Sequence, residues 1–165
     1  MDRLWSPWRY SYIRKVPGAG PCVFCEIAAS GRDDENFVLY RGERNFVLLN
    51  LYPYTSGHLM IAPFEHVATL EAAQPETLDE MMRLTRLSEI YLRAVYQPAG
   101  LNAGINIGEA AGAGIAAHIH MHVLPRWPGD ANFLSVIGET RVLPEALEST
   151  YQKLRPKFQE AGGRV

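Results

Sequence analysis

The chain has 165 residues, a formal net charge of -2, 47% hydrophobic residues and 21% charged residues. This length fits one domain with a sizeable core, and this composition is not that of a disordered chain. The small net charge gives no support for a nucleic-acid or membrane-surface partner, and no apolar run approaches the ~20 residues of a membrane span.

The first 21 residues are expected to form an aromatic-rich leader, and residues 22–165 a single domain. The leader contains Trp5 and Trp8 and ends in a loop signal rich in proline and glycine at 17–21. It lacks the apolar core of a signal peptide. The chain has only two cysteines, too few for a secreted disulfide scaffold. We therefore expect a cytoplasmic protein.

Periodicity and turn signals divide the remaining chain into helices and strands. In chain order we expect a short helix over 22–29, strands over 37–41, 45–51 and 58–62, a long amphipathic helix over 75–96, strands over 102–107 and 117–124, and a last helix from about 144 to 159. The long helix begins with Pro75 and stops at Pro98-Ala99-Gly100. This order predicts an α+β fold with an antiparallel five-stranded sheet, one long helix and one C-terminal helix.

Three of the five histidines alternate with apolar residues in the segment His118-Ile119-His120-Met121-His122. Alternation with period two predicts a half-buried strand, with the apolar residues inward and the three imidazoles on the opposite face. Three rings on one face lie within reach of a shared ligand or substrate. The segment therefore indicates a functional site.

Three interpretations compete for these histidines. They are a structural cluster or an incidental metal site; a catalytic metal site; or a nucleophilic site acting on phosphorus. A catalytic metal site needs further ligands downstream, but no histidine follows His122, and 165 residues are too few for a TIM barrel of ~250. A neutral imidazole is a good nucleophile at pH 7, and a neighbouring imidazole can protonate a leaving oxygen. The small-residue loop 108–115 favours this third interpretation, because its backbone N–H groups can approach an anion.

The chain resembles the histidine triad (HIT) superfamily of nucleotidyl hydrolases and transferases. The resemblance rests on the His-φ-His-φ-His-φ-φ signature at 118–124, on segments 50–63, 101–108 and 122–133, and on Leu4-Trp5-Ser6-Pro7-Trp8-Arg9. Within the superfamily the chain is similar to the bacterial branch of diadenosine tetraphosphate phosphorylases or ATP adenylyltransferases. The resemblance covers nearly the whole chain. It implies a homodimer joined through the long helix and a continuous sheet, with Trp5, Trp8 and Trp127 as candidate interface aromatics.

The resemblance implies an enzyme that cleaves dinucleoside polyphosphates at the α-phosphate through a nucleotidyl-histidine intermediate. His120 would be the nucleophile, and His122 would contact the phosphate and the leaving oxygen. The phosphoryl oxygens would be held by Asn106 and by the backbone of Gly112, Ala113, Gly114 and Ile115. His58 would lie beside the nucleophile, or would only cap the entry to its strand.

Alternatives to this function are a nucleoside phosphoramidate hydrolase and a non-catalytic purine-nucleotide-binding regulatory module. A two-histidine phosphoesterase requires a second His-x-Ser/Thr motif, which the chain lacks. Close phosphorylase relatives carry a hydroxyl residue where this chain has Gly114. The acceptor therefore stays open between inorganic phosphate and water.

The resemblance also implies a pocket for the AMP moiety of a purine nucleotide. Val23, Phe24, Ile27 and Leu48 would line the base, and Asn50 would bind the ribose hydroxyls. The apolar residues could equally be plain core, and for Phe46 the core is favoured. No organic cofactor is implied.

The Cys22-Val23-Phe24-Cys25 pair admits a redox role or a metal role. Thioredoxin-like pairs follow a strand in a βαβ unit, and none is visible here. A zinc site needs two more nitrogen or sulfur donors. Several zinc-containing HIT relatives add a histidine after the third strand and the first histidine of the triad, and these positions match His66 and His118. We therefore expect structural zinc on Cys22, Cys25, His66 and His118, with unliganded thiols as the alternative.

Overall fold

The computed structural model describes residues 21–130 and 145–160. In chain order they form α2 (Val23–Ser30), β1 (Val38–Arg41), β2 (Asn45–Leu49), β3 (Leu59–Pro63), α3 (Pro75–Tyr96), β4 (Gly100–Ile105), the 3-10 turn η1 (Glu109–Ala111), β5 (Met121–Arg126) and α5 (Leu147–Glu160). The leader with Trp5 and Trp8, and the expected start of the last helix near residue 144, lie outside the described residues.

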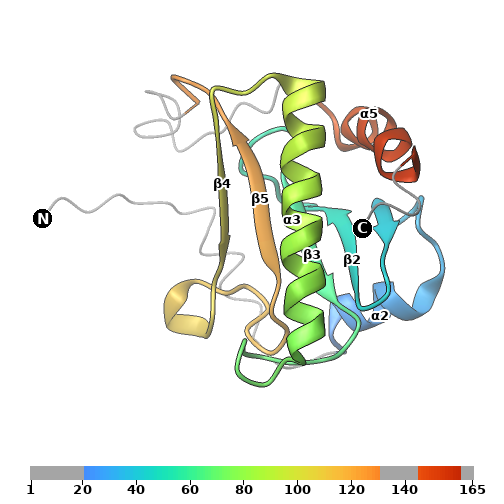
Figure 1. Ribbon diagram of the computed structural model, residues 1–165, viewed down its shortest axis with the longest axis vertical. Helices are drawn as coiled ribbons and strands as arrows, with labels where there is room; N and C mark the ends of the chain where they lie inside the picture. The colour runs from blue at the N-terminus through green and yellow to red at the C-terminus, as the bar shows by residue number, and fades with distance from the viewer. Residues whose placement is uncertain (1–20, 131–144, 161–165) are drawn as a thin grey trace, which may run out of the picture.

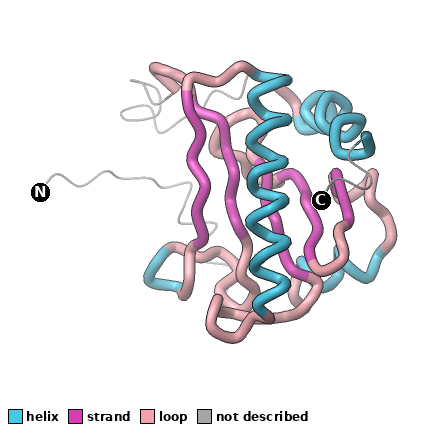
Figure 2. Tube along the Cα trace, in the orientation of Figure 1, coloured by secondary structure: helices cyan, strands magenta, loops and turns pink. Residues whose placement is uncertain are grey.

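The five strands form one antiparallel sheet in the order β1-β2-β3-β5-β4. The long helix α3 runs across one face of this sheet, and α5 packs beside it over β1 (Figure 1). Figure 2 shows the same layers, with the strands side by side behind the long helix. The predicted α+β fold with a five-stranded antiparallel sheet is confirmed.

Alternation along the strands divides the core into two clusters. One cluster includes Val47, Leu49 and Ile61 and lies between the sheet and helices α3 and α5. The other joins Phe46 and Leu48 to residues of α2. The helix α2 therefore covers the sheet face opposite α3. Because Met121 and Val123 belong to the α3 side, the residue between them, His122, points to the α2 side.

The long helix has the predicted bounds. Pro75 occupies the first helical turn, where its missing N–H costs nothing, and the helix ends at Gln97, whose φ of 46° is left-handed. No described helix combines the length and apolar character required to cross a lipid bilayer.

One charged residue, Glu80, is buried on the inner side of α3, with 5% of its surface exposed. Its carboxylate accepts N–H groups from the backbone of Glu43 at 2.7 Å and Arg44 at 2.8 Å and from Asn45 Nδ2 at 2.8 Å. It also borders a charged hollow of about 230 Å³. Because both oxygens of this carboxylate accept hydrogen bonds from the turn between β1 and β2, we assign Glu80 a structural role.

The two strands at the far side of the sheet have different bounds from those expected. The strand expected at 102–107 is β4 at Gly100–Ile105, and the strand expected at 117–124 is β5 at Met121–Arg126. These strands pair from Gly100 opposite Arg126 to Ile105 opposite Met121. Before Met121 the chain leaves this ladder, and the Ile119 N–H donates instead to the Val67 carbonyl at 2.8 Å. Of the three alternating histidines, only His122 lies in the strand.

Candidate active site and metal centre

Four segments far apart in the sequence bring the histidines and cysteines together. These are the start of α2, the loop between β2 and β3, the chain after β3, and the beginning of β5 with the extended chain before it. The rings of His120 and His122 lie 4.8 Å apart, and those of His58 and His122 5.1 Å apart. The ring of His118 turns instead toward the cysteines. The three alternating histidines therefore divide between two adjoining groups: His120 and His122 lie with His58, and His118 lies with the cysteines.

His120 is held as a neutral ring with one free nitrogen. Its Nδ1 lies 3.0 Å from the backbone carbonyl oxygen of His118, so Nδ1–H donates to that oxygen. In a neutral imidazole the other nitrogen then carries a lone pair. Burial lowers the pKa of His120, although the hydrogen bond to His118 acts in the opposite direction. Nε2 of His120 is therefore unprotonated at neutral pH and can act as a nucleophile.

A short relay fixes the proton on His122. The Tyr54 N–H donates to His58 Nδ1 at 3.1 Å, so the proton of His58 is on Nε2. That Nε2 lies 2.9 Å from Nδ1 of His122, which must accept. Burial and then the neighbouring His120 lower the pKa of His122 to about 4. His122 is therefore neutral near pH 7, with its proton on Nε2, and it can donate a hydrogen bond there.

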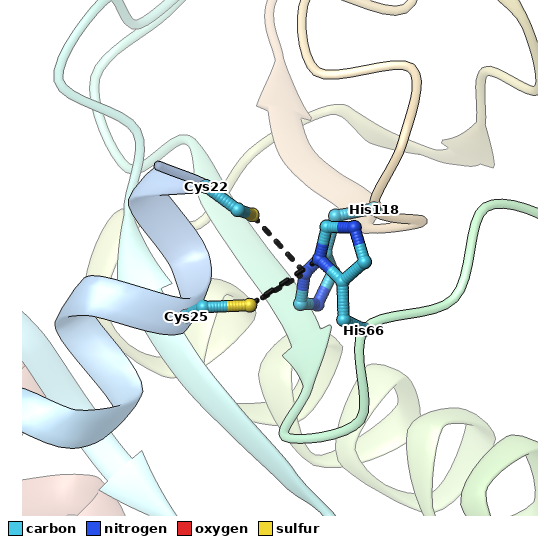
Figure 3. Close-up of side chains that lie close together, drawn as sticks. All are labelled: Cys22, Cys25, His66 and His118. Carbon is cyan, nitrogen blue, oxygen red and sulfur yellow. Dashed lines mark hydrogen bonds between the residues drawn. The ribbon is translucent and has the colours of Figure 1, made fainter. Parts of the chain in front are cut away.

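The predicted metal residues form one compact group (Figure 3). Nδ1 of His118 lies 3.3 Å from Cys22 Sγ and 3.7 Å from Cys25 Sγ, and Nδ1 of His66 lies 3.3 Å from Cys25 Sγ. All four donor atoms lie within 4.8 Å of one another. Tetrahedral zinc with bonds of about 2.0–2.3 Å places its ligand atoms roughly 3.5 Å apart. The group therefore has the donor chemistry and the spacing that zinc requires.

The orientation of the His118 ring is a second observation that fits zinc binding. Its Nε2 lies 2.9 Å from the Pro63 carbonyl oxygen, so Nε2 donates and Nδ1 keeps its lone pair toward the thiols. Metal-binding histidines are commonly oriented by such a bond from the other ring nitrogen. Burial, more than its other contacts, lowers the pKa of His118, which favours the neutral form that a metal needs.

The residues expected to contact a nucleotide divide into a buried set and an exposed set. Phe24, Ile27 and Leu48 pack together on the α2 side of the sheet, and Ile115 packs against them. Val23, by contrast, is 39% exposed. The structure also confirms core packing for Phe46, whose ring stacks on Phe64.

The polar residues expected to bind the nucleotide lie at the ends of strands. Asn50 follows β2; its Oδ1 accepts the Tyr52 N–H, and its Nδ2 lies 3.4 Å from His58 Nδ1. Asn106 follows β4 directly. Its neighbour Ile105 makes the last pair of the β4–β5 ladder with Met121, the residue that follows His120.

The small-residue loop expected to hold the phosphoryl oxygens leads from β4 back toward the histidines. It contains η1 and two glycines with left-handed φ, Gly108 at 81° and Gly112 at 83°. Ala113 follows, and Gly114 lies in the next turn. Left-handed φ angles of this kind favour glycine, so the small residues here suit the backbone path as well as an anion.

Sequence reasoning missed Tyr54. Its ring centre lies 4.8 Å from that of His58 and 6.2 Å from that of His122, to which it is nearly parallel at 25°. Its only sequence signal is its place between Pro53 and His58 in the loop before β3. Its backbone N–H donates to His58, and a backbone hydrogen bond of this kind cannot be predicted from the residue type.

Comparisons with known proteins agree with this architecture. The family model described as HIT domain matches residues 32–129. AP-4-A phosphorylase from Mycobacterium tuberculosis is 39% identical over 166 aligned residues, covering 96% of this chain and 85% of that protein.

Solved structures agree as well. A Zn-bound histidine triad family protein from Mycobacterium smegmatis superposes with a TM-score of 0.69 at 29% identity, over 87% of this chain and 97% of that one. A hypothetical histidine triad nucleotide-binding protein from Sulfolobus tokodaii has a TM-score of 0.68 at 26% identity, over 87% of this chain and 96% of that one.

Proposed function

Because the chain belongs to the HIT family, we propose that it cleaves dinucleoside polyphosphates at the α-phosphate through a nucleotidyl-histidine intermediate on His120. The observation that carries the proposal is the proton arrangement of the two neighbouring rings. His120 has a lone pair on Nε2, and His122 has its proton on Nε2. One ring can attack phosphorus while the other donates to the leaving group.

In the first step Nε2 of His120 forms a bond to the α-phosphorus, and the bond from phosphorus to the bridging oxygen breaks. The departing nucleoside polyphosphate takes the bonding electron pair on that oxygen. The Nε2–H of His122 donates a hydrogen bond to it, which stabilises the developing negative charge. The Asn106 side chain and the backbone of 112–115 hold the non-bridging phosphoryl oxygens.

In the second step the acceptor attacks the same phosphorus, and the bond to Nε2 breaks. Because Nδ1 of His120 keeps its proton on the His118 carbonyl, the phosphorus-bound ring is cationic and leaves as a neutral imidazole. Inorganic phosphate as acceptor yields ADP from an adenylyl intermediate, and water yields AMP with release of a proton.

The AMP moiety lies against Phe24, Ile27, Leu48 and Val23, and Asn50 binds the ribose hydroxyls. This assignment is supported by the apolar cluster beside the histidines, where the Phe24 ring lies 4.9 Å from that of His120. Aromatic and aliphatic surfaces next to a few convergent polar groups are typical of small-molecule sites.

Zinc is held by Cys22, Cys25, His66 and His118 and serves the fold, because four protein ligands leave no open position for a substrate. This is supported by the spacing of the donors and by the Pro63 bond that aims His118. Metal analysis of the purified protein is expected to give one zinc per chain. Cys25→Ala should lose the metal and lower the melting temperature. A wild-type protein that neither contains zinc nor is stabilised by added zinc would contradict the assignment.

The protein is a homodimer through β4 and the outer face of α3. In the described sheet β4 is an edge strand, and α3 exposes Met82 (59%) and Ile90 (43%). Exposed edges and apolar side chains favour burial against a partner. Light scattering should give twice the chain mass, and a monomer at micromolar concentration would refute the dimer.

The decisive experiment incubates the protein with diadenosine tetraphosphate, with and without inorganic phosphate. ADP plus ATP marks phosphate as the acceptor, and AMP plus ATP marks water. Quenching in base with labelled substrate should trap the label on His120, because the bond from phosphorus to histidine nitrogen is stable in base and hydrolyses in acid. His120→Gly should lower kcat by about 10³ or more while AMP still binds. Unchanged turnover in that variant, or AMP binding without any turnover by the wild type, would refute the catalytic assignment.

A further inference from the structure

The loop between β2 and β3 places one residue, Tyr54, against both histidines of the relay. Its backbone N–H donates to His58 Nδ1 at 3.1 Å. Its ring lies 4.8 Å from the His58 ring and 6.2 Å from the His122 ring, at an interplanar angle of 25° to the latter. Main chain and side chain of one residue thus contact the two rings that share the 2.9 Å hydrogen bond.

We propose that Tyr54 is a positioning residue that fixes the proton of His122 on Nε2 and the plane of its ring. The main-chain part acts through His58: an N–H aimed at Nδ1 requires the His58 proton on Nε2, and that proton requires a lone pair on Nδ1 of His122. The side-chain part acts directly, because the flat Tyr54 ring lies offset beside the imidazole, 6.2 Å away at an angle of 25°, and there hinders rotation of His122 about its χ2 angle.

The loop itself is tied down at several points, so the position of Tyr54 relative to His122 is defined. The Thr55 hydroxyl donates to the Pro125 carbonyl at 3.1 Å, which links the loop to the far part of β5. Gly57 has a φ of 79°, and a Cβ there would meet Leu92 at 3.1 Å. The loop is therefore packed against the strand that carries His122 and against α3.

Without the Tyr54 ring, the backbone N–H and the bond from His58 Nε2 remain, but that single bond alone then holds the His122 ring against rotation. Each time the ring turns over, the bond breaks, and the proton can move between the two nitrogens. A ring with a bare Nε2 cannot donate to the leaving oxygen. This consequence rests on the proposed role of His122 as hydrogen-bond donor to the leaving oxygen. The loss of kcat should therefore be larger for leaving groups of high pKa, which depend more on that hydrogen bond.

The first test measures protonation directly. Long-range ¹H–¹⁵N correlation spectra of ¹⁵N-histidine-labelled protein near pH 7 should show a protonated Nε2 and a bare Nδ1 for His122 in the wild type and in Tyr54→Phe. In Tyr54→Ala the ¹⁵N shift difference between the two nitrogens should fall by half or more as the tautomers average. Tyr52→Ala, at a residue in the same loop that is 66% exposed, is the matched control and should leave the His122 signals unchanged.

The second test measures catalysis with adenylyl substrates that share AMP and differ in leaving group. Tyr54→Ala should lower kcat at least tenfold more for a poor leaving group, an alkyl alcohol, than for p-nitrophenol, with KM within twofold. Tyr54→Phe should match the wild type. If Tyr54→Ala does not fold, Tyr54→Leu keeps the bulk without the flat ring and takes its place in both tests.

The outcomes separate the two proposals. Wild-type His122 signals in Tyr54→Ala, or a loss equal for all leaving groups, would overturn the role of Tyr54. A wild type that turns over none of these substrates would refute the proposed function, while the spectra would still decide the role of Tyr54.

Discussion

Replacing Glu80 with glutamine tests whether a buried carboxylate secures the turn between β1 and β2. One oxygen of the carboxylate accepts the Glu43 N–H, and the other accepts the Arg44 N–H and Asn45 Nδ2. Glutamine keeps one acceptor oxygen but turns an NH₂ group toward an N–H donor. Glu80→Gln therefore loses one bond to a charged group and weakens the other two.

Hydrogen bonds to charged groups contribute about 1.5–3 kcal/mol each. The expected loss in the free energy of unfolding is therefore about 2–3 kcal/mol at pH 7. For a chain of this size that corresponds to a fall in melting temperature of roughly 5–10 °C. Urea unfolding and thermal melts measure it, and Glu71→Gln, at an exposed position, is the control and should stay within about 0.5 kcal/mol.

The pH dependence gives a second check on the same residue. Burial alone would raise the pKa of the Glu80 carboxyl, but the hydrogen bonds from Asn45, Glu43 and Arg44 outweigh burial and lower it. Its contribution to stability is thus present above the unfolded carboxyl pKa of about 4.3 and is lost as pH falls through the lower folded value. A difference between wild type and Glu80→Gln that is small at pH 7, or that persists undiminished in strong acid, would refute the reasoning.

Three further predictions concern Gly42, Arg41 and His122. Gly42→Ala should destabilise the fold by about 1–3 kcal/mol in thermal melts, because the added Cβ would lie 2.6 Å from Glu80 Oε1; unchanged melting would contradict this packing. Arg41→Met should cost about 1.5–3 kcal/mol by urea unfolding, since the guanidinium donates to Asp33 and to the Ile27 and Ala28 carbonyls at the end of α2. Arg41→Lys, which lacks the planar fork, should not restore the loss. Burial is the main reason that the pKa of His122 is lowered to about 4, so an NMR titration should give a midpoint near that value. In the unfolded chain the same histidine takes up its proton near pH 6.5, so the free energy of unfolding should fall as pH drops from about 6.5 to about 4. An NMR midpoint above 6 would disprove the burial argument.

The bounds of the long helix could be predicted from residues near its ends, whereas the bounds of the strands depend on which strands pair. The bounds of α3 follow from Pro75, from the apolar spacing and from the stop at Pro98, all of which are local. The start of β5 depends on which residues β4 can reach, so alternation alone extended the predicted strand to 117, although the ladder begins at Met121. Extended chain and strand share the same period of two, and a sequence does not distinguish them.

In the candidate site, too, some residues could be predicted from the sequence and others could not. The spacing of Cys22 and Cys25 indicates a metal role, the resemblance to zinc-containing HIT proteins adds His66 and His118, and the structure brings all four together. Glu80 left a weak signal as a charge in the apolar stripe of α3, beside Met81 and Leu84. Tyr54 left almost none, because its contribution comes from a backbone donor and from a ring orientation that exist only after folding.

His118 belongs to two assemblies at once: its ring faces the thiols, and its carbonyl oxygen holds the ring two residues further on. Replacing its side chain removes the ring that faces the thiols and also the bond to the Pro63 carbonyl that anchors the backbone at this position. A defective variant there therefore does not by itself distinguish a lost metal from a misdirected attacking nitrogen. The cysteines separate the two, since they touch only the first assembly. Changes to the metal group made through the cysteines leave the bond to the reactive ring in place, whereas changes made at His118 act on both the metal group and the aim of His120.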